Sequence, residues 1–205
     1  MKRLFLASSF ADVTEIFEKF TNEKIKGKTV TFISTASIPE EVTFYVDDDK
    51  KAFEELGIIV HEFNVTEHSG REIANTLDNN DYIFVSGGNT FYLLQELKNT
   101  GADKIIAEQI KKGKIYIGAS AGSIIMAPSI EYVDTMDDRT KAEKLNKDQA
   151  LGIVDFHPLP HYTNPPFETI VEDIIREFED RIDLIPISNT QAIEVKGDNF
   201  KVVGK

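Results

Sequence analysis

Five short apolar runs alternate with amphipathic segments over the first part of the chain. Each run has the length of a buried β-strand, and the runs lie at Arg3–Ala7, Thr29–Ser34, Ile58–Phe63, Tyr82–Val85 and Ile115–Ile117. Hydrophobic residues recur at helical spacing between them, near residues 11–24, 40–56, 70–77, 90–98 and 102–112. This alternation is typical of βαβ units. It predicts an α/β fold of three α/β/α layers, in which helices cover both faces of a mostly parallel central sheet.

The last third of the chain has a different character. Residues 128–150 are polar and show no period, which predicts a long surface loop or a lid. A strand is expected within residues 153–161, and a helix is expected to begin at Pro165-Pro166. Short C-terminal strands are predicted at Leu184–Ser188, Gln191–Val195 and Phe200–Val203. The sequence shows no repeat and no linker, so we expect residues 1–205 to form a single domain.

The composition excludes several classes of function. The 205 residues carry a formal net charge of −12, which argues against partners such as nucleic acids or acidic membranes, because both require a basic surface. No apolar run approaches the roughly 18 residues of a membrane span, and the first one is too short for a signal peptide. A cytoplasmic location is therefore expected. The chain has no cysteine and no H-E-x-x-H motif, so we expect no thiol chemistry, metal or cofactor.

The run Ile115–Ile117 leads directly into Gly118-Ala119-Ser120-Ala121-Gly122. This is the G-x-S-x-G pattern, in which a serine stands at the tip of a sharp turn from a strand into a helix. Small neighbours are needed there because the strand and the helix approach closely. Such a turn exposes the hydroxyl beside free helix N-terminal N–H groups, which suits a nucleophile that passes through an oxyanion. The alternative is a glycine-rich turn that only packs tightly.

Two further segments could complete a site with this serine. His157 and His161 follow the elbow near the predicted end of a strand, and Pro160 stiffens the backbone before His161. The turn Gly87-Gly88-Asn89-Thr90 also joins a strand to a helix, with Asn89 or Thr90 as the helix N-cap. That turn could bind a phosphate. It could instead supply the Gly88 N–H, paired with the Ala121 N–H, as an oxyanion hole, and the elbow favours this second interpretation.

Three motifs together carry a resemblance to a known family. They are Gly87-Gly88-Asn89-Thr90-Phe91-x-Leu93-Leu94, Tyr116-Ile117-Gly118-x-Ser120-Ala121-Gly122 and Leu159-Pro160-His161-Tyr162-Thr163-Asn164. In this order they resemble the peptidase E family of serine peptidases, which includes cyanophycinase-like enzymes. The resemblance covers most of the chain. It implies a flavodoxin-like fold similar to that of class I glutamine amidotransferases, with serine where those enzymes carry cysteine.

The resemblance also implies roles for residues. Ser120 would be the nucleophile, His161 the general base, and the N–H groups of Gly88 and Ala121 the oxyanion donors. The third member of the triad has two candidates: Asp134 in the loop after the elbow, which we favour slightly, and Asn189, which stands where the family often has a glutamate. Asn89 and His157 are predicted to contact substrate.

The expected activity is hydrolysis of small peptides through an acyl-enzyme on Ser120. Ile170 stands where aspartyl dipeptidases of the family carry an arginine that suits a substrate carboxylate, so a strict preference for N-terminal aspartate is not predicted. Two alternatives stay open. One is a non-catalytic binding or regulatory member of the same fold, and the other is an esterase or amidase that acts on a non-peptide acyl group.

Overall fold

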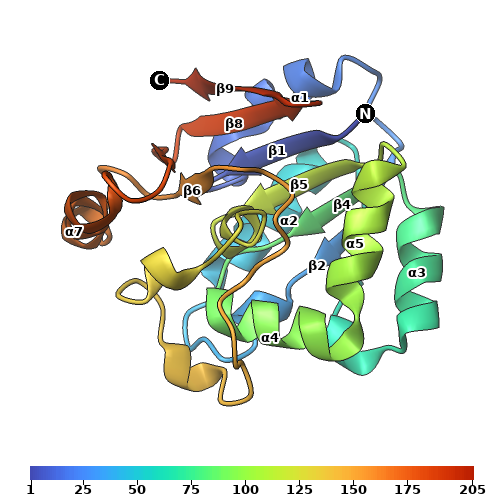
Figure 1. The fold of residues 1–205 in the computed structure, drawn as a ribbon. Coiled ribbons are helices and arrows are strands. Elements are labelled where there is room, and N and C mark those ends of the chain that lie inside the picture. Colours follow the sequence, from blue (N-terminus) through green and yellow to red (C-terminus); the bar gives the residue numbers. More distant parts are fainter.

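A seven-stranded sheet forms the centre of the molecule in the computed structural model, which describes residues 1–205 (Figure 1). Its strands stand in the order β3-β2-β4-β5-β1-β8-β9. The bounds are β1 (Arg3–Ala7), β2 (Thr29–Ile33), β3 (Ile59–Phe63), β4 (Tyr82–Val85), β5 (Ile115–Ala119), β8 (Gln191–Lys196) and β9 (Asn199–Gly204). The first five are parallel, whereas β8 runs antiparallel to β1 and β9 antiparallel to β8. The predicted mostly parallel sheet is confirmed.

Helices cover both faces of this sheet, which gives the three layers expected from the sequence. On one face lie α3 (Gly70–Asn79), α4 (Thr90–Thr100) and α5 (Ala102–Lys111), whose apolar side chains pack with Leu6, Val85 and Tyr116 in one core. On the other face lie α1 (Thr14–Thr21) and α2 (Phe44–Glu55). Because strand residues alternate between the two faces, every central strand is buried on both sides.

The core under α1 and α2 is rich in phenylalanine. Phe53 of α2 is fully buried and stacks on Phe10, with ring centroids 4.0 Å apart. It also meets Phe84 of β4 edge-on at 5.0 Å. Aromatic pairs in such geometries add to the free energy gained by burial alone. This cluster holds α2 against the sheet close to the carboxyl ends of the central strands.

The C-terminal third forms a smaller unit beside the sheet. The strands β6 (His157–Leu159) and β7 (Leu184–Pro186) pair in parallel, and α7 (Glu168–Phe178) connects them. The strand expected within residues 153–161 is therefore only three residues long. Likewise α7 begins at Glu168 and not at the two prolines, because Phe167 is the N-cap residue.

Residues 128–150 are less irregular than their sequence suggests. They contain two short 3₁₀ turns, Glu131–Val133 and Arg139–Lys141, and no longer helix or strand. Tyr132 and Val133 are buried against α4 and α7 in a third apolar cluster. The segment is thus anchored on the protein surface by apolar contacts. None of the helices in the structure combines the length and hydropathy needed to cross a bilayer.

Replacing Phe53 with alanine should lower the free energy of unfolding by about 3–5 kcal/mol, because it leaves a cavity between α2 and the sheet. Urea unfolding followed by circular dichroism measures this change. Phe44→Ala is the matched control on the same helix, since Phe44 is 67% exposed, and it should change the stability by less than about 1 kcal/mol. Equal losses for the two variants would contradict the described core.

Candidate active site

Ser120 stands at the tip of a strained turn between β5 and the short helix α6 (Ala121–Ile124). Its backbone has φ 47° and ψ −110°, a conformation that a residue with a side chain rarely adopts. The Ser120 N–H donates to the carbonyl of Ala7, 3.0 Å away, and so ties the turn to the end of β1. Strain of this kind persists only where the surrounding structure imposes it, and it is typical of a nucleophile elbow.

The two glycines of the elbow are required by contact distances. A Cβ atom at Gly122 would lie 2.1 Å from the carbonyl oxygen of Val85, and one at Gly118 would lie 2.5 Å from the Gly122 oxygen. These distances leave no room for any side chain. The hydroxyl of Tyr116 donates to that same Gly122 oxygen at 2.6 Å, which fixes the turn from below. The interpretation of the G-x-S-x-G pattern as a sharp, tightly packed strand-to-helix turn is confirmed.

His161 lies within hydrogen-bond distance of the serine. Its Nε2 atom is 2.9 Å from Ser120 Oγ. His161 has φ 67°, and its N–H donates to Ser8 Oγ at 3.1 Å. The imidazole stacks on the ring of Phe167, with centroids 4.6 Å apart and an interplanar angle of 21°. The backbone conformation and the stacked ring together restrict the imidazole to one orientation.

Asn189 contacts the other side of the imidazole. Its Oδ1 atom lies 2.9 Å from His161 Nδ1. An amide oxygen only accepts hydrogen bonds, so Nδ1 carries the proton and Nε2 presents its lone pair to the serine hydroxyl. The Asn189 N–H donates to Asn164 Oδ1 at 2.8 Å, which links the loop after β7 to the segment that carries His161.

Burial lowers the pKa of His161 below its ordinary value, and the hydrogen bond that its Nδ1–H donates to Asn189 Oδ1 offsets only part of this effect. The imidazole is therefore neutral at neutral pH. A neutral imidazole can accept a proton from Ser120, as a general base must.

Two backbone N–H groups beside Ser120 lack acceptors within the protein. They belong to Ala121, the first residue of α6, and to Gly88, in the turn between β4 and α4. Gly88 has φ 132°, and a Cβ atom there would lie 2.3 Å from the Ala36 carbonyl. A Cβ atom at the adjacent Gly87 would lie 3.2 Å from Ser120 Cβ, so this turn packs directly on the turn that carries Ser120. Both N–H groups are available to a developing negative charge.

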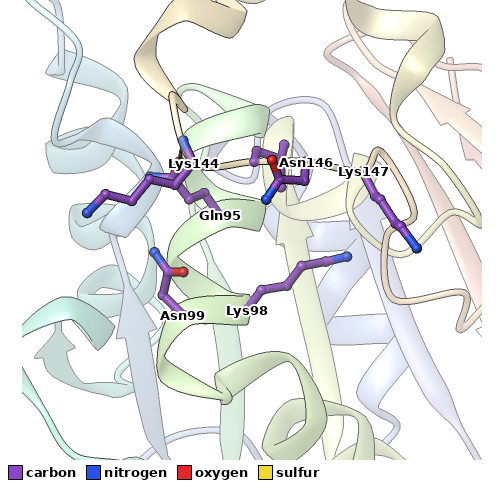
Figure 2. A pocket seen from close by; sticks show the side chains of 7 residues that line it. Gln95, Lys98, Asn99, Lys144, Asn146 and Lys147 are labelled. Carbon is purple, nitrogen blue, oxygen red and sulfur yellow. Dashed lines mark hydrogen bonds between the residues drawn. The ribbon is translucent and has the colours of Figure 1, made fainter.

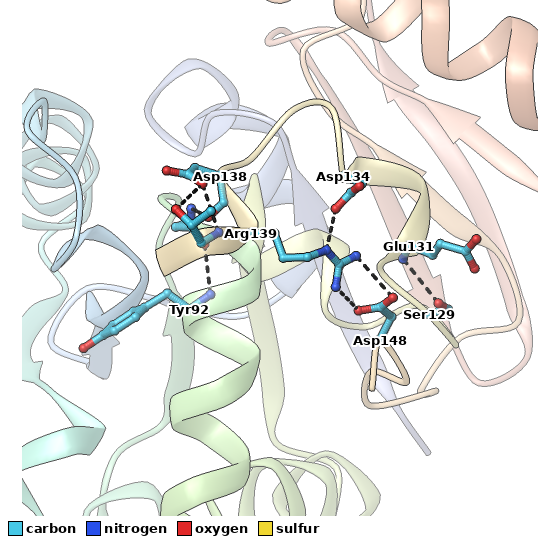
Figure 3. Close-up of polar contacts among 9 residues, drawn as sticks. Tyr92, Ser129, Glu131, Asp134, Asp138, Arg139 and Asp148 are labelled. Atoms are coloured by element: carbon cyan, nitrogen blue, oxygen red, sulfur yellow. Dashed lines mark hydrogen bonds and ion pairs between the residues drawn. The ribbon is translucent and has the colours of Figure 1, made fainter. Parts of the chain in front are cut away.

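Asp134, the favoured third member, is not placed at His161. Its carboxylate accepts from Arg139 Nε at 2.5 Å, and Arg139 also binds Asp148 at 2.6 Å (Figure 3). These two ion pairs connect three positions of the 128–150 segment. The guanidinium of Arg139 also lies over the ring of Phe91, 4.2 Å from its centroid. Asn189 occupies the position beside the imidazole. The sequence could not decide between the two because the distance depends on the course of this loop.

The two predicted substrate contacts also have other surroundings. Asn89 is buried, with its Oδ1 accepting from the Tyr92 N–H at 2.9 Å and its amide nitrogen donating to the Asp138 carbonyl at 3.0 Å. It is the N-cap of α4. His157 lies in β6 beside Tyr132, with ring centroids 5.2 Å apart. Neither Asn89 nor His157 lines the cleft at Ser120.

A cleft of about 830 Å³ opens over Ser120 and His161. Its walls come from the ends of β1, β4 and β5, from α2, and from the segments around Met136 and Phe167. Sequence reasoning missed the roles of Ser8 and Phe167, which contact His161, and of Asn164, which binds the Asn189 N–H. It also missed Tyr45 and Asp137, which line the cleft. Only the position of Ser8 immediately after a predicted strand could have indicated its role.

A second hollow lies away from this cleft, between α4 and the 128–150 segment (Figure 2). It measures about 280 Å³, and its charged lining residues are Lys98, Lys144 and Lys147. No serine or histidine lines it, so it offers no nucleophile and base for acyl transfer.

Comparison with known proteins agrees with this geometry. The sequence profile of peptidase family S51 matches residues 4–203. The chain belongs to this family. It is 53% identical to an uncharacterized peptidase of Listeria monocytogenes over 197 residues, which are 96% of each chain. It is also 31% identical over 169 residues to the peptidase E of a Nostoc species, covering 80% of this chain and 66% of the relative.

A solved structure gives the same result for this S51 family chain. A crystal structure of a protein assigned to peptidase E from Listeria monocytogenes superposes with a TM-score of 0.95 and 51% identity, covering 100% of this chain and 99% of the other. The resemblance drawn from the three sequence motifs is therefore confirmed, and so is the predicted fold.

Gly122→Ala should lower the free energy of unfolding by about 3 kcal/mol, because the new methyl group overlaps the Val85 carbonyl and forces the backbone to shift. Gly70→Ala is the control, since the nearest atom to its Cβ would lie at 3.7 Å. That variant should stay within about 1 kcal/mol of the parent. Matching urea midpoints for the two variants would refute the close approach at the elbow.

Asn189→Asp should raise the pKa of His161, because a carboxylate next to Nδ1 favours the charged imidazolium. A base acts only when unprotonated, so the acid limb of the rate of reaction at Ser120 should move to higher pH by about 1 unit or more. The rate of labelling by a neutral fluorophosphonate measures this limb. Asn146→Asp adds the same charge in the lysine-lined hollow and should leave the limb in place. An unmoved limb in Asn189→Asp would show that Asn189 does not contact the base.

Proposed function

We propose that this peptidase hydrolyses small peptides by serine-type acyl transfer at Ser120. The observation that carries the proposal is the row Ser120 Oγ, His161 and Asn189 Oδ1, joined by two contacts of 2.9 Å. A nucleophile, a base and a group that orients the base form the basic unit of this chemistry. The cleft volume of about 830 Å³ is consistent with a substrate of a few residues.

The reaction follows from the positions of the atoms. Ser120 Oγ attacks the carbonyl carbon while its proton passes to His161 Nε2. The carbonyl oxygen becomes an oxyanion, and the N–H groups of Gly88 and Ala121 donate to it. The imidazolium then gives its proton to the leaving amine, and the C–N bond breaks. Water attacks the resulting acyl-enzyme through the same base, which releases the acid and regenerates Ser120.

Asn189 gives this mechanism a particular character. Its amide oxygen holds the tautomer that leaves Nε2 free, as a carboxylate would. It carries no charge, so it stabilises the imidazolium less than a carboxylate does. We therefore expect a functional but modest turnover.

The strained elbow argues against a purely binding role. A binding module has no need of a serine at φ 47°, or of two N–H groups left without acceptors beside it. An esterase or amidase would use the same groups, and substrate tests with esters and amides separate it from a peptidase. Ile170, at the position of the family's arginine, packs in the apolar cluster under α7 and supplies no charge to the cleft.

A fluorophosphonate probe should form one adduct, on Ser120, and Ser120→Ala should abolish it. His161→Ala should slow labelling by about 10²–10⁴-fold, because the serine then has no base. His157→Ala is the matched control and should react at nearly the parent rate. Mass spectrometry of the intact and digested protein measures the adduct.

Folded protein that remains unlabelled at Ser120 would rule out the nucleophile. A strong defect in His157→Ala together with a normal His161→Ala would transfer the role of base to the other histidine. A dipeptide library then tests hydrolysis, with Ser120→Ala as the blank.

A further inference from the structure

The charge of the cleft is one-sided. Six carboxylates line it, at Asp12, Glu40, Asp48, Asp49, Glu55 and Asp137, against a single lysine, Lys51, and no arginine. Lys51 lies 3.7 Å from Glu55, so these two charges largely offset each other. The other five carboxylates form no ion pair with any cation of the protein. Burial raises the pKa of Asp49 to about 7 and that of Asp137 to about 6, so at neutral pH Asp137 keeps most of its charge and Asp49 about half. Walls of one sign concentrate molecules of the opposite charge.

A tyrosine of the cleft wall, Tyr45, lies close to Ser120. The ring of Tyr45 is 3.7 Å from the Cβ position of Gly87, which itself lies 3.2 Å from Ser120 Cβ. The hydroxyl of Tyr45 is buried and has no hydrogen-bond partner within the protein. An unpartnered buried hydroxyl at a cleft wall is a polar group that a bound molecule can satisfy.

Three carboxylates accompany this hydroxyl. Burial and the negative charges of Glu40, Asp137 and Asp49 raise the pKa of Tyr45 to about 12, so all three acids act on the phenol. One oxygen of Asp137 accepts from the Thr90 N–H at 2.8 Å, at the start of the helix that follows Gly88, and the other oxygen is free. Asp137 therefore contacts the end of the same β4–α4 turn that carries the Gly88 N–H.

This arrangement suits a cation and disfavours an anion. A substrate carboxylate near Tyr45 would meet like charges and no arginine or free lysine to offset them. An ammonium group could donate to the Tyr45 oxygen and to the free oxygen of Asp137.

We propose that the cleft selects peptides with a free ammonium group next to the bond that is cut, held by Tyr45 with Asp137 and Glu40, and rejects peptides with an N-terminal acidic residue. The proposal rests on the proposed function, since it concerns the substrate of the same serine. The expected substrates are therefore peptides whose first residue is neutral or basic.

Three chromogenic anilides test the proposal with the full-length enzyme. They are leucine p-nitroanilide, its desamino analogue 4-methylpentanoyl p-nitroanilide, and aspartic acid α-p-nitroanilide. The leucine compound should have the highest kcat/KM. Removal of its ammonium group should lower kcat/KM by about tenfold or more, as expected for a lost hydrogen bond to a charged group. The aspartyl compound should be cleaved more slowly than the leucine compound.

Variants then locate the effect. Asp137→Asn keeps an acceptor for the Thr90 N–H but removes the charge, and Glu40→Gln removes the second charge. Each should lower kcat/KM for the leucine compound several-fold and leave the desamino compound nearly unchanged, so that the ratio between the two falls. The neighbours Asp138→Asn and Glu41→Gln, which do not line the cleft, are matched controls and should keep the parent ratio.

The outcomes separate this inference from the proposed function. If Ser120-dependent hydrolysis is equal with and without the ammonium group, or favours the aspartyl compound, the inference is wrong and the serine peptidase stands. If the ratio is unchanged in both charge variants, Tyr45 and its acids do not hold the substrate. If no compound is cleaved and the fluorophosphonate leaves Ser120 unmodified, the proposed function fails and the inference falls with it.

Discussion

The close approach of β4, β5 and α6 is the constraint on which the site depends. Gly122 lies against the Val85 carbonyl at a distance that no side chain allows, and Ser120 takes a positive φ in the same tight turn. The turn that carries Gly88 packs on the same elbow, since a Cβ atom at Gly87 would lie 3.2 Å from Ser120 Cβ. Close backbone packing thus places the hydroxyl near both N–H groups, and the hydrogen bond from the Ser120 N–H to the Ala7 carbonyl ties the turn to β1. The aromatic core under α2 supports this arrangement, because it holds α2, with Tyr45 and Asp49, at the same sheet edge.

The histidine is positioned by a different principle. His161 belongs to a segment outside the central sheet, and four contacts from separate elements restrict it: Ser8 at the end of β1, Phe167 before α7, Asn189 after β7 and Ser120 itself. Ser8 can donate to the carbonyls of Ile187 and Ser188, each 3.0 Å away, so one hydroxyl joins the sheet to the loop that carries Asn189. A rigid elbow and a cross-linked loop therefore meet at the edge where parallel strands end.

The sequence predicted those features that depend on local pattern. Strand positions follow from apolar runs, and the elbow follows from two glycines around a serine, since both depend on neighbours along the chain. The choice between Asp134 and Asn189 depended on where a polar loop travels, and no local pattern encodes that path. In the structure, Asp134 pairs with Arg139, which also pairs with Asp148, and these ion pairs hold the Asp134 carboxylate within the loop and away from His161. Tyr45 and Asp137 were missed for the same reason, as their meeting at the cleft is a long-range contact.

An uncharged partner for the base has a consequence for chemistry. An asparagine amide can turn over and present NH₂ to the imidazole, which would force the proton onto Nε2 and leave the serine without a base. A carboxylate has no NH₂ group, so either of its oxygens accepts from the imidazole N–H. The backbone of this loop is held by two contacts: the Asn189 N–H donates to Asn164 Oδ1, and the preceding Ser188 N–H donates to the side chain of Gln191 at 3.0 Å. Burial favours the neutral imidazole, so in the proposed mechanism Asn189 need only select its tautomer, and the Gly88 and Ala121 N–H groups would stabilise the charge that develops on the substrate.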